Sequence, residues 1–110
     1  MVVGTCRLAL AIPGGSSLKG KRKIVRSILD RVRHRFNVAI AEVDDQDVHR
    51  RAVLGLAVVS NDSRHAQSMI DSLVSFIASS TEAPLVDRRT EILHVGDEGF
   101  GDFGGGWDDG

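Results

Sequence analysis

The amino-acid sequence predicts an α+β protein of the ferredoxin-like type, in which two helices cover one face of a four-stranded antiparallel sheet. Three observations carry this prediction: two amphipathic stretches with helical period, four apolar stretches typical of strands, and their β-α-β-β-α-β order along the chain. With 110 residues, 42% of them hydrophobic, the chain has the size of one domain. The predicted strands are residues 2–12, 37–44, 51–60 and 83–95, and the predicted helices are residues 17–36 and 61–80.

The strands differ in how clearly they are marked. Residues 2–12 alternate so that one face carries Val2, Gly4, Cys6, Leu8, Leu10 and Ile12, and the segment PGGSS ends the strand. Residues 37–44 and 51–60 flank the polar turn DQDVH, which predicts a hairpin. Arg88 and Thr90 interrupt the apolar alternation of residues 83–95, which is typical of an edge strand or a strand that faces a partner.

Both helices have an apolar stripe and a candidate N-cap. At 100° per residue, the first helix gathers its large apolar side chains in an arc of roughly 140°: Ile24, Val25, Ile28, Leu29, Val32 and Phe36. The second places Ala66, Met69, Ile70, Leu73 and Ile77 at helical spacing. We expect Ser16 or Ser17 to cap the first helix and Asp62 or Ser63 to cap the second.

Positive charge is concentrated on the first helix. The chain has a formal net charge of −1, yet residues 17–35 hold eight Lys or Arg and one acid, Asp30, which gives +7, whereas residues 36–110 sum to −9. A charged helix face is often only solvated. Here the clustering favours anion binding, with nucleic-acid phosphate as the ligand. The candidate anion-binding residues are Lys19, Lys21, Arg22, Lys23, Arg26 and Arg33, of which Lys19, Arg22, Arg26 and Arg33 share an arc of roughly 60°.

The face of the sheet away from the helices is expected to be small and apolar. The outward strand positions include Val3, Ala9, Ala11, Ala39, Ala41, Val53, Gly55, Ala57 and Val59. Such a patch predicts a homodimer through the open sheet face, or coverage by the C-terminal segment. The chain has no Tyr, and its other aromatic residues lie on helices or in the tail, which argues against RNA bases stacking on the sheet.

The chain divides into a domain of residues 1–96 and a tail of residues 97–110. The tail is rich in Gly and Asp, contains Phe100, Phe103 and Trp107, and has no period, which predicts disorder. A lone cysteine, no convincing signal peptide and no apolar run of ~20 residues predict a cytoplasmic protein that does not enter membranes.

No catalytic or metal-binding constellation is recognisable, so we expect no enzyme activity, metal or cofactor. Gly15, Gly20 and Lys21 have P-loop spacing, but Arg22 stands where a P-loop needs Ser or Thr. An enzyme of phosphate esters that uses the turn from Gly15 to Arg22 is therefore kept only as a third possibility. Glu42 is expected to point inward by alternation, where it pairs with a Lys or Arg at the start of the basic helix, unless a bulge turns it outward.

The segments LKGKRKIVRSILDRVRHRFNVAIAEVDDQD and VVSND resemble the YlxP-like family of small bacterial proteins of unknown function. The resemblance covers about residues 1–95 and implies a ferredoxin-like fold. Family members are often encoded near genes of translation initiation and ribosome maturation, which implies an RNA or ribosome partner. The family offers no catalytic residue to carry over. Arg88, Thr90 and the tail depart from its pattern.

These observations favour a non-enzymatic module that binds RNA or the ribosome through phosphate contacts. The alternative is a structural or regulatory homodimer whose basic face binds an acidic protein or its own acidic tail.

Overall fold

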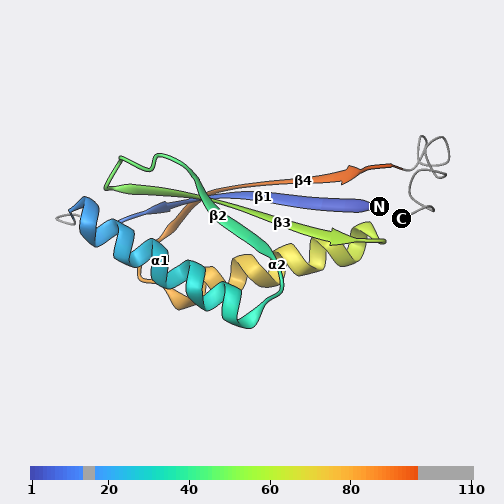
Figure 1. Ribbon diagram of the computed structural model, residues 1–110, viewed down its shortest axis with the longest axis horizontal. Helices are drawn as coiled ribbons and strands as arrows, with labels where there is room; N and C mark the ends of the chain where they lie inside the picture. The colour runs from blue at the N-terminus through green and yellow to red at the C-terminus, as the bar shows by residue number, and fades with distance from the viewer. Residues whose placement is uncertain (14–16, 97–110) are drawn as a thin grey trace, which may run out of the picture.

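The chain has the predicted fold and element order. The computed structural model describes residues 1–13 and 17–96, and its order is β-α-β-β-α-β (Figure 1). The sheet runs β2-β3-β1-β4 with every neighbouring pair antiparallel, which confirms the ferredoxin-like arrangement. The elements are β1 (Val2–Ala11), α1 (Leu18–Arg35), β2 (Ala39–Asp44), β3 (Arg51–Ser60), α2 (Ser63–Ser80) and β4 (Leu85–His94). The predicted tail lies outside the described residues.

Both helices begin at capped N-termini and cover the same face of the sheet (Figure 1). The Ser17 hydroxyl accepts a hydrogen bond from the Gly20 backbone N–H at 3.1 Å, and the Asp62 carboxylate accepts one from the Arg64 N–H at 3.3 Å. Each cap satisfies a backbone donor that the first helical turn leaves unpaired. Ser16, the other candidate cap of α1, lies outside the described residues.

The core lies between the helices and the inner face of the sheet. The alternation of β1 and β3 sends their even-numbered side chains inward, where Leu8, Leu10 and Leu54 are fully buried. The helices contribute one stripe each, which for α1 is Val25, Ile28 and Val32 and for α2 is Ala66, Ile70, Leu73, Val74 and Ile77. Burial of these apolar side chains fixes α1 in place, and therefore decides which of its charged residues reach the solvent.

A β-bulge changes the open face of the sheet. Glu42 lies opposite Leu54 and Asp44 lies opposite Val53, which leaves Val43 as the extra residue. Val43 covers Gly55 so closely that a Cβ atom on that glycine would lie 2.7 Å from Val43 Cγ1. The bulge therefore directs two successive side chains of β2 over the open face.

The expectation of an uncovered face of small residues is wrong for part of this face, whereas Ala39, Ala41 and Val59 are exposed as expected. Ala9 is only 4% exposed and Val53 only 1%. Arg7 Nη2 donates to Asp44 Oδ2 at 2.6 Å, so an ion pair also lies across this face. The apolar side chains still exposed there include Val59 and Leu93, which are both cross-strand partners of Val3.

Candidate anion-binding surface

Four cationic side chains gather around one shallow hollow at the start of α1. Lys19, Arg22, Lys23 and Arg26 are exposed and line this hollow. They fall within two turns of a helix that rises about 1.5 Å per residue. Within residues 1–13 and 17–96, none of the four is paired with a carboxylate. The hollow therefore presents uncompensated positive charge, which suits an oxyanion such as phosphate.

Arg33 lies two turns further along α1, beside β2. Its Nη2 donates a hydrogen bond to the Ile40 backbone carbonyl at 2.8 Å. A carbonyl is a neutral acceptor, so this contact fixes the guanidinium without cancelling its charge. Arg33 is therefore placed to extend the positive surface of the hollow along the helix.

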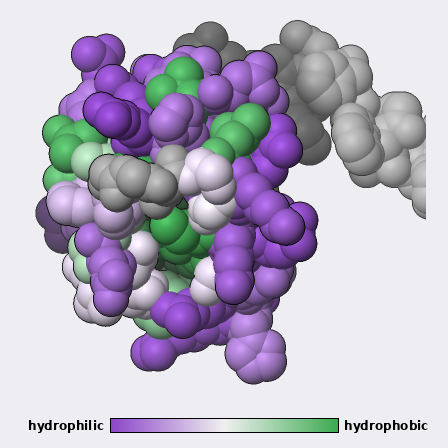
Figure 2. Space-filling view, turned by 90° about the vertical axis from the view of Figure 1, so that its left-hand side faces the viewer, coloured by the Kyte–Doolittle hydropathy of each residue, from purple (hydrophilic) through white to green (hydrophobic). Residues whose placement is uncertain are grey.

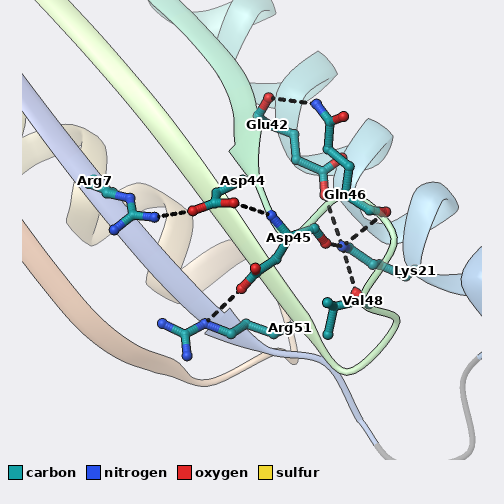
Figure 3. Close-up of polar contacts among 8 residues, drawn as sticks. All are labelled: Arg7, Lys21, Glu42, Asp44, Asp45, Gln46, Val48 and Arg51. Atoms are coloured by element: carbon teal, nitrogen blue, oxygen red, sulfur yellow. Dashed lines mark hydrogen bonds and ion pairs between the residues drawn. The ribbon is translucent and has the colours of Figure 1, made fainter.

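Lys21 does not belong to this surface. Its side chain has no solvent exposure, and its ammonium is turned toward the β2–β3 connection (Figure 3). Lys21 Nζ donates to the carbonyl oxygens of Asp45 and Val48, the latter at 2.7 Å, with Gln46 O at 3.5 Å. The inclusion of Lys21 among the anion-binding residues is therefore corrected, because its ammonium is enclosed by protein oxygens.

Glu42 is the charged partner of Lys21. It points inward opposite Leu54, its side chain is 18% exposed, and its Oε2 lies 3.0 Å from Lys21 Nζ. That oxygen is buried and accepts no hydrogen bond from a described residue, so its contact with the ammonium is an ion pair. Glu42 therefore points inward and pairs with a lysine at the start of α1, as expected. The bulge lies one residue later, at Val43, and does not turn Glu42 outward.

The buried pair attaches the start of α1 to the β2–β3 connection. The same connection is held by an ion pair between Arg51 Nε and Asp45 Oδ2 at 3.3 Å (Figure 3). A hydrogen bond from the Val48 N–H to Asp45 O at 3.0 Å also holds it. The P-loop-like spacing consequently supplies no lysine to a phosphate, because Lys21 already binds carbonyl groups of its own chain.

The opposite flank of α1 carries two further cations that the sequence reasoning left out. Arg31 Nη1 donates to the Ser80 carbonyl at the end of α2. The Arg35 guanidinium carbon lies 5.1 Å from the ring centre of Phe76 and 5.8 Å from that of Phe36. Arg31 and Arg35 follow Lys23 by eight and twelve residues. This multiple of four is the sequence signal that could have added them to the predicted anion-binding residues.

Arg88, which interrupts the alternation of β4, faces the helices and contacts α2. Its guanidinium donates a hydrogen bond to the Asp71 carboxylate, which also accepts one from Gln67 Nε2 at 3.0 Å. These two hydrogen bonds, the one from Arg88 above all, lower the pKa of Asp71 below its usual value. Asp71 is therefore an acid whose charge is already matched.

The described residues contain no helix that is long and apolar enough to cross a membrane. Nor do the residues that the structure covers bring three or more His, Cys, Asp or Glu side chains together as a metal site.

The fold and this surface define a small ferredoxin-like protein with a strongly basic first helix. The chain belongs to a family described as "Protein of unknown function (DUF503)", whose model matches residues 3–90. It is 33% identical over 90 residues to the "Uncharacterized protein YlxP" of Bacillus subtilis (strain 168), and the alignment covers 82% of this chain and 98% of that relative. The resemblance to YlxP-like proteins is thereby confirmed.

Proposed function

We propose that this protein is a non-enzymatic nucleic-acid-associated module that binds RNA phosphates through α1. The observation that carries the proposal is the hollow lined by Lys19, Arg22, Lys23 and Arg26, whose charges meet no described carboxylate. Arg33 adds a fifth charge to the same helix. Contacts of this kind hold a polyanion without reading its sequence, which suits a cytoplasmic protein that docks on a large RNA such as that of the ribosome.

Salt dependence tests the electrostatic origin of binding. Four to five phosphate contacts on single-stranded RNA give a slope of log affinity against log salt of about −3, so affinity falls about 60-fold between 50 and 200 mM salt. Fluorescence anisotropy with a labelled RNA oligonucleotide measures both the affinity and the slope. Binding that is weak at low salt and insensitive to added salt contradicts the proposal.

Charge reversal at the hollow tests its location. Arg22→Glu combined with Arg26→Glu removes two contacts and introduces repulsion, so we expect affinity to fall about tenfold or more and the salt slope to shrink by roughly half. The matched control is Arg64→Glu with Arg89→Glu, which changes the net charge equally on α2 and β4. Both positions are exposed on the surface of α1, and circular dichroism checks that the fold is retained. Unchanged binding by the α1 variant refutes the proposal.

The predicted homodimer is supported by a row of apolar side chains across the open face. Val59, Val3 and Leu93 are cross-strand neighbours on β3, β1 and β4, with Val59 63% and Leu93 43% exposed. We propose that a second copy of the chain packs on this row. Sedimentation over a range of concentrations tests it: the wild type should associate, and Leu93→Lys should remain monomeric. A monomeric wild type at the highest concentration rules the dimer out.

A further inference from the structure

A groove runs between the outer sides of α1 and α2. Its first part lies between α1 and the C-terminal end of α2, with Ile24, Ile28 and Ala83 among the apolar lining residues. Its second part lies beside Phe36 and Phe76, and Ser79 lines both parts. Figure 2 looks at the end of the molecule where α1 begins and shows a hollow with a hydrophobic floor inside a mostly hydrophilic rim.

One side of this groove is basic along its length. Lys23, Arg31 and Arg35 follow one i, i+4 ridge of α1 and lie about 12 and 6 Å apart along the axis. This ridge winds roughly 120° around the helix between Lys23 and Arg35. Within the described chain no carboxylate is paired with any of them, since Arg31 donates to a carbonyl and Arg35 lies over aromatic rings.

The acidic residues of the groove offset this charge only in part. Asp71 lines the second part, but its carboxylate is held by Arg88. Glu82 lines the first part. Of these two acids, only Glu82 is not paired with a described arginine, and the groove also holds three cations. The net field in the groove therefore attracts an anionic chain.

The far end of the groove holds a planar cation of fixed orientation. Phe36 and Phe76 pack edge to face, with ring centres 5.3 Å apart and planes at 71°. The Arg35 guanidinium is held against both rings by cation–π attraction. Arg35 is exposed, so its other side is open to a ligand. Guanidinium planes and aromatic rings are the surfaces on which single-stranded RNA bases stack.

We propose that the α1–α2 groove binds single-stranded RNA, with backbone phosphates on Lys23 and Arg31 and one base stacked on Arg35. This inference rests on the proposed function and adds a direction to it. Lys23 belongs both to the hollow at the start of α1 and to the groove, so the strand runs from the hollow toward Phe76. The base platform lies on the helices, whereas RNA-recognition sheets carry theirs on strands.

The test separates stacking from charge. Two ten-nucleotide RNA strands with equal numbers of phosphates are compared, a uridine decamer and one in which four internal residues are abasic. We expect the wild type to bind the uridine strand about five- to tenfold more tightly, which is the lower part of the range for one stacked base. Arg35→Lys keeps the charge but loses the plane, so it should abolish this preference and leave the affinity for the abasic strand unchanged. Arg64→Lys, on α2 outside the groove, is the matched control and should keep the preference.

A second variant guards against a trivial loss of fold. Phe76→Leu keeps apolar volume in the core but removes the ring that orients Arg35, so it should reduce the preference while circular dichroism stays unchanged. If Arg35→Lys keeps the preference, the groove inference is wrong. The same holds if the wild type shows no preference; as long as Arg22→Glu with Arg26→Glu still weakens binding about tenfold or more, the proposed function stands. If neither strand binds at low salt, the proposed function itself fails.

Discussion

The buried ion pair between Lys21 and Glu42 makes a sharp prediction about stability. Lys21→Met keeps the length of the side chain and removes the ammonium. The substitution leaves Glu42 without its charged partner among the described residues. It also removes the Lys21 donor from the Val48 carbonyl and leaves the Asp45 carbonyl with its bond from the Val48 N–H. Removing one partner of a buried pair costs about 3–5 kcal/mol. Because the Glu42 side chain is 18% exposed and can reach water, we expect the lower end, about 3 kcal/mol.

The loss is large for a domain of this size. Total stabilities are about 5–15 kcal/mol, so the variant should unfold at a visibly lower denaturant concentration. With a urea slope of about 1.5 kcal/mol/M, the midpoint falls by about 2 M and the slope is unchanged. Far-ultraviolet circular dichroism is the appropriate probe, because it follows the unfolding of the two 18-residue helices.

A double-mutant cycle shows whether the cost belongs to the pair. Lys21→Met with Glu42→Leu replaces both charges by apolar groups, which is often neutral, so part of the lost stability should return. We expect the double variant to be more stable than the sum of the single changes by about 1–3 kcal/mol. A cost below about 1 kcal/mol for Lys21→Met, or strict additivity in the cycle, would show that the ammonium is not held as described.

Two further predictions concern α2 and the glycines of the sheet. The lowered pKa of Asp71 means that its contact stabilises the fold above the usual pKa of 3.8 and stops doing so as the pH falls through the folded value. Asp71→Asn should therefore lower the urea midpoint at pH 6, and the difference from the wild type should close below pH 3.8; a gap that persists in acid rules out the linkage. Gly4→Ala places a Cβ atom 2.7 Å from a buried isoleucine of α2 and should cost about 1–3 kcal/mol. Gly55→Ala meets Val43 at the same distance, but Val43 is 52% exposed and can turn away, so the cost should stay below about 1 kcal/mol. Equal urea midpoints for the two glycine variants would contradict this contrast.

The fold could be predicted from sequence because its signals are local. Each helix shows a 3.6-residue period over 18 residues, and the burial of β1 alternates from Val2 to Leu8. The caps Ser17 and Asp62 were visible as residue types at the right positions. Such signals depend on residues close together in the chain, and the tertiary structure leaves them in place.

The candidate site was harder to predict from sequence, because the role of each cation depends on its angular position on the helix and on its tertiary contacts. Lys21 lies three residues before Ile24 and seven before Ile28, so helical spacing alone places it on the apolar stripe. That signal was present, but counting positive charges along the segment concealed it. The bulge at Val43 had no such signal, since a change of register depends on the partner strand. The contact of Arg35 with Phe76 had no sequence signal either, because it depends on how the two helices pack.

The kind of partner that each cation finds determines whether α1 can bind a polyanion. Of the eight Lys and Arg side chains between residues 17 and 35, only Lys21 meets a carboxylate among the described residues. Arg31 and Arg33 donate to backbone carbonyls, and Arg35 lies over rings, so each is oriented while its charge remains. The other ion pairs among the described residues join side chains outside α1. A helix built only for solubility has no need to orient its guanidinium groups in this way, because orientation costs side-chain entropy. That cost is offset if a ligand with phosphates at fixed spacing binds the oriented groups, which is why the salt slope and the Arg35→Lys comparison are the decisive measurements.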